Sequence, residues 1–302
     1  MRPTAIAAFI TVVFGVDGAQ AQGTAGGTDG HAALVSCRTA YNTRKTDEAI
    51  KWGEKAVKLL PDSSNAHLCL GQAYVQQLSD AAFFKQPFIA GKARGRFDRA
   101  VELDSNNYDA RDARATYYMY APAIGGGGMG KARAEAEVAR KIDPYRGGLL
   151  RGDIEQHDKQ IAAAENEFHA LMRAYPDSVS PFSRLVNMYQ SVGRFAEAFN
   201  AIDARLARMP NETVSRYMFA KTSAMSGERL EQGESMIRAY IKEGNFAVAS
   251  EAHAHNRLGM ILEKRKDFAG ALAEYEAAAR LDPKLEDAKA NAKRVRAQRG
   301  GR

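Results

Sequence analysis

Residues 254–283 read AHNRLGMILEKRKDFAGALAEYEAAARLDP, and this stretch decides the fold of the chain. Apolar and small residues recur in it at helical spacings, at Leu258-Gly259, Leu262, Phe268, Ala271, Tyr275 and Ala278, before Pro283. Residues three or four apart share one face of a helix. Small residues let two helices approach closely, and a large ring fills the space that remains. The stretch therefore predicts two short antiparallel helices that pack as one unit.

The same pattern recurs along the chain and closes at positions about one repeat apart: Pro61, Ser105, Pro144, Pro176, Pro210, near Asn245, and Pro283. It resembles the tetratricopeptide repeat (TPR), whose units are about 34 residues long. Seven units are predicted, over residues 33–62, 65–106, 108–145, 146–177, 179–211, 213–246 and 252–284. Residues 285–298 predict a polar helix that closes the last apolar face. The expected fold is all-α, a right-handed TPR superhelix (an α-solenoid) of about seven helix pairs plus a C-terminal capping helix.

The N-terminus has the pattern of a signal peptide over residues 1–21. Arg2 precedes a short apolar core, and Ala19-Gln20-Ala21 fits the small-residue cleavage rule, so cleavage is expected near Ala21. An uncleaved anchor is the alternative. We expect a flexible leader at 22–32, a TPR solenoid domain at 33–298 and a basic tail at 299–302. No later stretch reaches membrane-span length, so the mature chain is expected to lack a transmembrane segment and to be periplasmic or secreted.

Cys37 and Cys69 are the two cysteines, and both fall on the first helices of successive predicted units. First helices are neighbours in a solenoid, and an exported protein meets an oxidising compartment. A disulfide between them is one alternative, and two buried free thiols are the other.

The formal net charge is +7, and residues 284–302 hold seven Lys and Arg against Glu286 and Asp287. A basic end can contact anionic lipid or another acidic partner. The other interpretation is a solvated capping helix that frays into a polar tail. Nucleic acid is not expected as a partner, because aromatic residues are not interleaved with the basic ones.

Two segments depart from the regular repeat. Residues 75–92, VQQLSDAAFFKQPFIAGK, are an insertion that contains Phe83, Phe84 and Phe88. They predict either a longer helix pair that buries its own phenylalanines or an apolar flap over the concave face that forms part of a ligand pocket. Residues 121–132, APAIGGGGMGKA, read as a flexible glycine connector.

Together these two segments resemble a branch of bacterial exported TPR proteins. These typically carry an Ala-Pro-x-x-x-Gly-Gly connector before Lys-Ala, as residues 121–132 do. The branch includes the periplasmic T components associated with TRAP-type uptake systems, and related sterol-transport TPR proteins. The resemblance implies helices that surround a groove or pore for a hydrophobic ligand.

Catalytic patterns are missing from the sequence. The six histidines are scattered, and His253 and His255 are two apart, a spacing that points side chains in different directions on a helix. No paired Cys-x-x-Cys and no serine elbow occurs. We therefore expect no enzymatic activity, no cofactor and no metal site.

The first helix of each TPR unit lines the inner, concave surface. Registering each unit on its Leu-Gly turn gives a mixture of amide, hydroxyl, methionine and ionisable side chains as candidate binding residues: Gln72, Thr116, Met119, Tyr120, Asp153, His157, Asn187, Gln190, Met218, Met225, Asn256 and Met260. Amides can hydrogen-bond an extended peptide, and methionines adapt to variable apolar shapes. Few Lys or Arg fall at these positions, so a basic clamp for carboxylates is not expected.

These patterns predict a non-enzymatic periplasmic scaffold that binds a protein or peptide partner in its concave groove. The alternative is a carrier or accessory protein for a small hydrophobic ligand, as the resemblance to TRAP-associated and sterol-transport proteins implies. Phe83, Phe84 and Phe88 are the candidate ligand contacts in that alternative.

Overall fold

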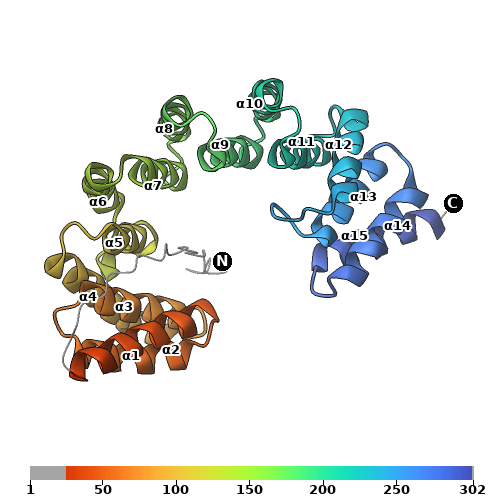
Figure 1. Cartoon of the computed structure of the whole chain (residues 1–302). Coiled ribbons are helices and arrows are strands. Elements are labelled where there is room, and N and C mark those ends of the chain that lie inside the picture. The colour runs from red at the N-terminus through yellow and green to blue at the C-terminus, as the bar shows by residue number, and fades with distance from the viewer. Residues whose placement is uncertain (1–24, 301–302) are drawn as a thin grey trace. The chain divides into compact units, whose positions relative to one another are not determined.

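The computed structural model describes residues 25–300, and every regular element in that range is a helix. The helices form seven consecutive pairs followed by one last helix (Figure 1). Their bounds are α1 (Ala25–Asn42), α2 (Thr46–Leu59), α3 (Ser64–Leu78), α4 (Gln86–Leu103), α5 (Tyr108–Tyr120), α6 (Met129–Ile142), α7 (Pro144–His157), α8 (Ile161–Ala174), α9 (Val179–Ser191), α10 (Phe195–Arg208), α11 (Thr213–Ser226), α12 (Leu230–Glu243), α13 (Glu251–Lys264), α14 (Phe268–Leu281) and α15 (Glu286–Gly300). Two short 3-10 helices, η1 (Phe83–Lys85) and η2 (Ala123–Gly125), lie in connectors. The predicted all-helical architecture is confirmed.

The described residues form two compact units, one ending at Glu167 and the other beginning at Phe168. The first contains α1 to α7, and the second contains α9 to α15. Within each unit, a helix packs against its pair partner and against the next pair, as α3 does with α4 and α5, and α13 with α14 and α15.

Polar side chains begin several of the helices by accepting a free backbone N–H in the first turn. Asn107 accepts from the amide of Ala110 at 3.1 Å, and Asp143 accepts from that of Arg146 at 2.9 Å. Pro144 was predicted to close the third unit, but it is instead the first residue of α7. Proline is favoured there because the N–H that it lacks has no partner within the helix.

Glycines mark the places where paired helices come closest. A Cβ added at Gly71 would lie 2.6 Å from the ring of Phe97, and one added at Gly259 would lie 2.6 Å from the ring of Tyr275. Both rings are fully buried. A small residue on the first helix and an aromatic ring on the second therefore set the packing distance in each of these pairs.

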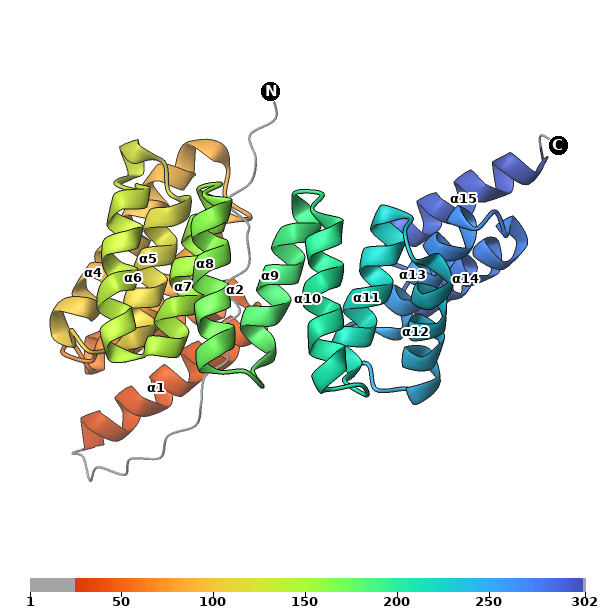
Figure 2. The same ribbon diagram turned by 90° about the horizontal axis from the view of Figure 1, so that it is seen from above.

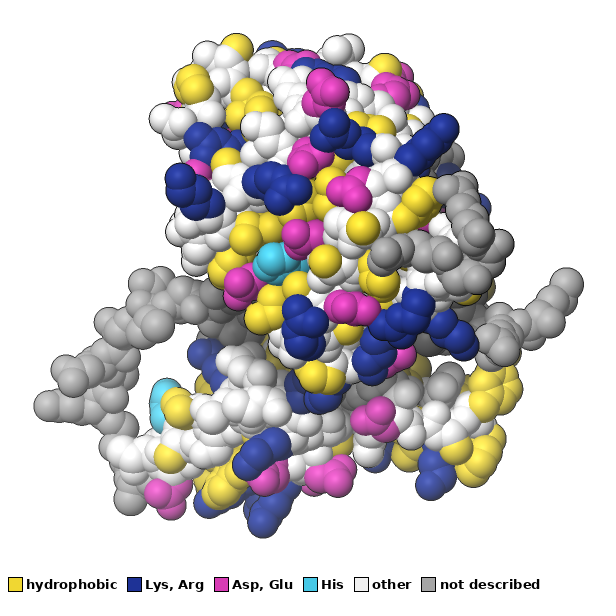
Figure 3. Space-filling view, turned by 90° about the vertical axis from the view of Figure 1, so that its right-hand side faces the viewer, with side chains coloured by type: hydrophobic (Ala, Val, Ile, Leu, Met, Phe, Trp, Pro, Cys, Tyr) yellow, Lys and Arg dark blue, Asp and Glu magenta, His cyan; other side chains and the backbone are white. Residues whose placement is uncertain are grey.

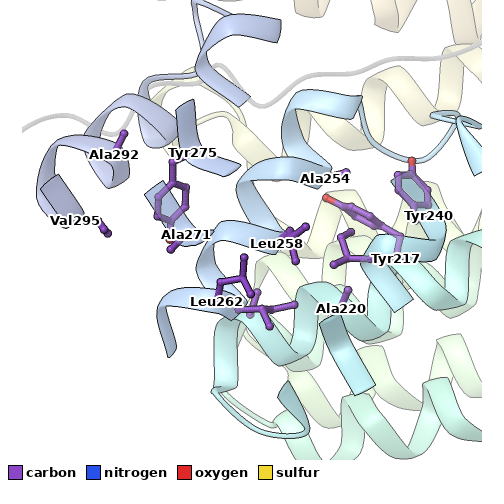
Figure 4. Close-up of a cluster of buried hydrophobic side chains, with 13 residues drawn as sticks. Tyr217, Ala220, Tyr240, Ala254, Leu258, Leu262, Ala271, Tyr275, Ala292 and Val295 are labelled. Carbon is purple, nitrogen blue, oxygen red and sulfur yellow. The ribbon is translucent and has the colours of Figure 1, made fainter. Parts of the chain in front are cut away.

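The core of the second unit is a continuous cluster that runs from α11 to α15 (Figure 4). Tyr217 and Tyr240 pack with their ring centroids 5.2 Å apart, and Leu258 of α13 and Tyr275 of α14 belong to the same cluster. Val295 of α15 is fully buried against it. The last helix therefore covers the apolar face of the final pair, as a terminal cap does in repeat proteins.

The predicted flexible leader at 22–32 is wrong from residue 25 onward, because α1 begins at Ala25. Gly30 is buried, and a Cβ there would lie 2.5 Å from Leu60. Gly30 thus permits α1 to lie close to the end of α2. The predicted signal peptide, 1–21, and residues 22–24 lie outside the described residues.

At the other end of the chain, α15 continues to Gly300, so the predicted tail at 299–302 begins as helix. Residues 301–302 lie outside the described residues.

Cys37 of α1 and Cys69 of α3 form a disulfide with their Cα atoms 6.5 Å apart. Small buried residues surround it, including Ala33, Ala56 and Ala66. Of the two alternatives that the sequence leaves open, the structure therefore has the disulfide, which joins the first helices of two successive pairs.

The cations of α15 are largely paired with acidic residues. Arg294 bonds Glu263, Arg296 lies 2.5 Å from Glu276, and Lys289 lies 2.9 Å from Glu286. Figure 3 shows Lys and Arg side chains interspersed with Asp and Glu over the face that it presents. These pairs favour the interpretation of the basic C-terminal segment as a solvated capping helix.

Candidate functional site

The phenylalanines of the insertion are exposed to solvent. Phe83, Phe84 and Phe88 are 78, 78 and 69% exposed, and their neighbour Ile89 alone is buried. The insertion does lengthen the second pair, since α4 has 18 residues. The expectation that the pair buries its own phenylalanines is nevertheless wrong. The adjacent cavity, of about 470 Å³, is lined by Tyr74, Gly91, Lys92, Gly95 and Arg96, and so includes none of the three rings.

Half of the predicted concave residues are buried between helices: Gln72, Thr116, Met119, Gln190, Met218 and Asn256. Gln190 donates to the Thr222 hydroxyl at 2.8 Å and so connects α9 with α11. Asn256 accepts from Asn291 at 3.2 Å and connects α13 with α15. A ligand-facing position is therefore wrong for these six residues. The side chains close to the Leu-Gly turn face the next first helix, which leaves them little surface for a ligand.

The other six predicted residues keep some solvent exposure. In the first unit these are Tyr120, Asp153 and His157, and the rings of Tyr120 and His157 meet edge to face at 4.7 Å. In the second unit they are Asn187, Met225 and Met260.

Asn187 leads to the candidate site of the second unit, because its Oδ1 accepts a hydrogen bond of 2.6 Å from Nζ of Lys221. Asn187 lies on α9 and Lys221 on α11, and α11 packs against both α9 and α13. Lys221 is half-buried, and burial lowers the pKa of its ammonium group. The positive charge of Arg257 on α13 lowers that pKa further.

Arg257 is also half-buried and interacts with the Tyr217 hydroxyl and, through Nη1, with the sulfur of Met260 at 3.2 Å. Its Nε is buried and has no hydrogen-bond partner. Among the described residues, neither Lys221 nor Arg257 has a carboxylate at ion-pair distance. A half-buried cation without a counterion is costly, so this pair favours an incoming anion.

An acidic side chain or a chain-terminal carboxylate fits this chemistry. Guanidinium can donate two parallel hydrogen bonds to one carboxylate, and the ammonium of Lys221 adds a second positive charge. The site therefore differs from the mixed amide and methionine surface that the sequence predicts.

Sequence reasoning missed both cations. Lys221 follows Asn187 by 34 residues, one repeat length, and this spacing is the signal that would have placed it on the inner surface. The predicted register of the sixth pair instead uses Met218, and one turn after Met218 it reaches Thr222, the residue after Lys221; both of those side chains are buried. Arg257 lies between the predicted Asn256 and the Leu258 of the repeat pattern, and it is not among the predicted binding residues.

Within residues 25–300, no group of three or more His, Cys, Asp or Glu side chains is arranged to hold a metal ion. None of the helices in the same range has the length and hydropathy of a membrane span.

Residues 252–285 match the tetratricopeptide repeat family. A comparison with curated proteins found no match. A solved structure of a tetratricopeptide repeat protein from Parabacteroides merdae is similar with a TM-score of 0.57 and 14% identity, covering 89% of this chain and 99% of that one.

Two further solved structures have a TM-score of 0.50. PilW, described as a widely conserved type IV pilus biogenesis factor, is 17% identical over 75% of this chain and 97% of its own. The Cut9-Hcn1 hetero-tetramer of the APC/C contains a chain that is 14% identical over 87% of this chain and 48% of its own. At these identities the likeness concerns the fold. The chain thus has the tetratricopeptide-repeat fold, and residues 252–285 carry the sequence signature of that repeat.

Proposed function

We propose that this protein is a non-enzymatic scaffold that binds an acidic segment of a protein partner through Lys221 and Arg257. The observation that carries the proposal is the half-buried pair of cations on α11 and α13, which has no carboxylate partner among the described residues. Two structural neighbours, PilW as a biogenesis factor and a chain of the Cut9-Hcn1 hetero-tetramer, are consistent with a scaffold.

An acidic peptide would bind to this pair of cations through its negative charge. Arg257 offers a planar fork of donors, and Lys221 is held in place by Asn187. We further propose that the partner is met outside the cytoplasm, which rests on the signal-peptide pattern of residues 1–21.

Fluorescence anisotropy tests this function with two labelled peptides of equal length, one rich in Asp and Glu and the other with Asn and Gln in their place. The wild-type protein should bind the acidic peptide. Lys221→Met and Arg257→Met should each weaken binding about tenfold or more, since each removes a charge-assisted hydrogen bond. Lys242→Met, which removes an exposed lysine at the end of α12, serves as the matched control.

Equal affinity for the two peptides would contradict the proposal, because the site would then not read charge. Unchanged acidic-peptide binding by both site variants would contradict it as well.

A second candidate function is the carrier of a small hydrophobic ligand, as in the TRAP-associated branch. It is favoured by a cavity of about 450 Å³ in the second unit, whose lining combines apolar side chains such as Met172, Pro176 and Tyr189 with an equal number of polar ones. Ligand pockets of this size are common. Native mass spectrometry of protein purified from its own host should then show a bound mass, and a mass without ligand would contradict this candidate.

A further inference from the structure

The connector between α3 and α4 presents an unusual surface in the first unit. Its three phenylalanines, Phe83, Phe84 and Phe88, are each more than two thirds exposed. Large aromatic side chains are seldom left in water without a function, and contiguous exposed ones mark sites that bind a partner or a membrane.

Lysines are interleaved with these rings. Nζ of Lys85 lies 5.9 Å from the centroid of Phe84, and Nζ of Lys92 lies 4.8 Å from that of Phe88. Among the described residues, neither lysine has a carboxylate at ion-pair distance, in contrast to the paired cations of α15. Residues 79–99 contain five Lys and Arg side chains but only two acidic ones, Asp80 and Asp98.

The next connector extends the same surface. Ile124, in η2, is 98% exposed. η2 packs against α4, and a Cβ added at Gly126 would lie 2.2 Å from the guanidinium of Arg94 on that helix. Figure 2 shows the α3–α4 and α5–α6 connectors at the same edge of the first unit. We name Phe83, Phe84, Phe88 and Ile124, with Lys85 and Lys92, the aromatic edge.

We propose that the aromatic edge binds the surface of an anionic lipid membrane. Exposed rings beside unpaired lysines are the combination that inserts into the interface, where the rings enter the acyl boundary and the ammonium groups stay with the headgroup phosphates.

The interleaving of charge and ring favours a membrane over a protein partner. An apolar protein face that covered Phe84 and Phe88 would also bury the ammonium groups that lie over them, which is costly without a counterion. At a lipid interface the same ammonium groups remain hydrated beside negative charge, because a lysine can extend its charged end away from the apolar region. Protein interfaces place charge at the rim rather than in the centre of the contact.

Co-sedimentation with vesicles tests the proposal on the full 302-residue chain, so that residues 1–24 are common to every sample. The probes are vesicles of phosphatidylcholine alone and vesicles with a third of phosphatidylglycerol. The wild-type protein should bind the anionic vesicles and bind the neutral ones much more weakly. Added salt should weaken binding, because it screens the lysines.

Two sets of variants separate the two contributions. Lys85→Gln with Lys92→Gln should weaken binding to anionic vesicles by roughly fivefold per lysine. Phe83→Ser, Phe84→Ser and Phe88→Ser together should abolish measurable binding, since each inserted ring contributes about tenfold or more. The matched controls are Leu281→Ser, which removes a side chain that is 50% exposed in the second unit, and Lys242→Gln. Circular dichroism checks that each variant keeps its helices.

Wild-type protein that stays in the supernatant with anionic vesicles would overturn the proposal. The proposal is also overturned if the phenylalanine variant sediments as the wild type does, or if that variant loses a co-purified protein while the wild type shows no vesicle binding. The vesicle experiment does not involve Lys221 or Arg257, so its failure would leave the proposed peptide site unaffected.

Discussion

Two cations of the second unit, Arg205 and Lys221, stand in opposite environments. Arg205 of α10 is 4% exposed, and Nε and Nη2 each donate to a carboxylate oxygen of Glu212 at 2.6 Å. Its remaining donors reach the backbone carbonyls of Ser178 and Asp177 at 3.0 and 3.1 Å. Lys221 of α11 has one hydrogen bond, to Asn187, and a second cation beside it.

The difference teaches which buried charges belong to the fold and which are available to a ligand. Arg205 stands where four of the other second helices carry alanine, as at Ala139 and Ala278, and it also lies over the ring of Phe182 at 4.8 Å. With all of its contacts made inside the unit, it connects α10 with the turns that precede α9 and α11. Lys221 has donors left over, and the fold supplies no anion for them.

The largest expected effect is on stability at Arg205. Arg205→Leu should lower the free energy of unfolding by about 3–5 kcal/mol, because the largely buried carboxylate of Glu212 would lose its cation. Chemical denaturation followed by circular dichroism measures this change. Arg208→Leu, which removes an exposed pair with Asp177, is the control and should cost about 0–1 kcal/mol. If Arg205→Leu were as stable as the wild type, Arg205 would not be the structural cation that the comparison with Lys221 requires.

Packing in the regular final pair provides the next effect. Gly259→Ala should destabilise the protein by about 1–3 kcal/mol, because the new Cβ would lie 2.6 Å from the buried ring of Tyr275. Gly91→Ala, on the exposed face of α4, meets nothing within 4 Å and should instead stabilise the helix by about 0.5–1 kcal/mol. Thermal unfolding of the two variants should shift in opposite directions, and a shared direction would show that close helix approach is not what Gly259 provides.

Acid should weaken the ion pair between Arg205 and Glu212 and so lower the stability of the folded protein. Burial raises the pKa of Glu212, but hydrogen bonds from Arg205 and Ser215 outweigh it and hold that pKa below its ordinary value of 4.5. A carboxylate whose pKa is lower in the folded state stabilises the protein above its unfolded pKa, and this contribution is lost as the pH falls through the folded pKa. Denaturation midpoints measured between neutral pH and strongly acidic pH should therefore fall less in Arg205→Leu than in the wild type. If the denaturation midpoints of both proteins fell equally with pH, the ion pair of Glu212 would not contribute to the loss of stability in acid.

The smallest effect is expected at Lys221. Lys221→Met should leave stability unchanged or raise it by up to about 1 kcal/mol, because it removes a partly desolvated charge next to Arg257. The same denaturation experiment measures it beside Arg205→Leu. A loss as large as that of Arg205→Leu would show that Lys221 is a structural residue and would break the comparison.

The sequence predicts the helix pairs well because their packing depends on side-chain size. Gly71 and Gly259 each lie opposite a buried ring and follow the repeat pattern closely, so the sequence is enough to predict their helix pairs. Arg205 reads as a poor fit at an alanine position, since the pattern contains no sign of its partner Glu212.

The candidate sites are less readable for two physical reasons. A shift of one residue in the sixth pair exchanges Lys221 for Thr222, and on a helix this turns the chosen side chain by about 100°. Phe83 and Phe84 were expected in an apolar setting because large rings are usually buried, and only their three-dimensional surroundings show that they are exposed.

The most direct test of the central claim follows the titration of Lys221 itself by NMR of the lysine side chains, assigned with Lys221→Met. In the free protein the ammonium of Lys221 should lose its proton at a lower pH than the exposed lysines, because burial and Arg257 lower its pKa. Saturation with the acidic peptide should raise that pKa, since the peptide binds the protonated form, and affinity should therefore fall as the pH rises above the free-protein pKa. A titration of Lys221 that the bound acidic peptide leaves unmoved would contradict the account.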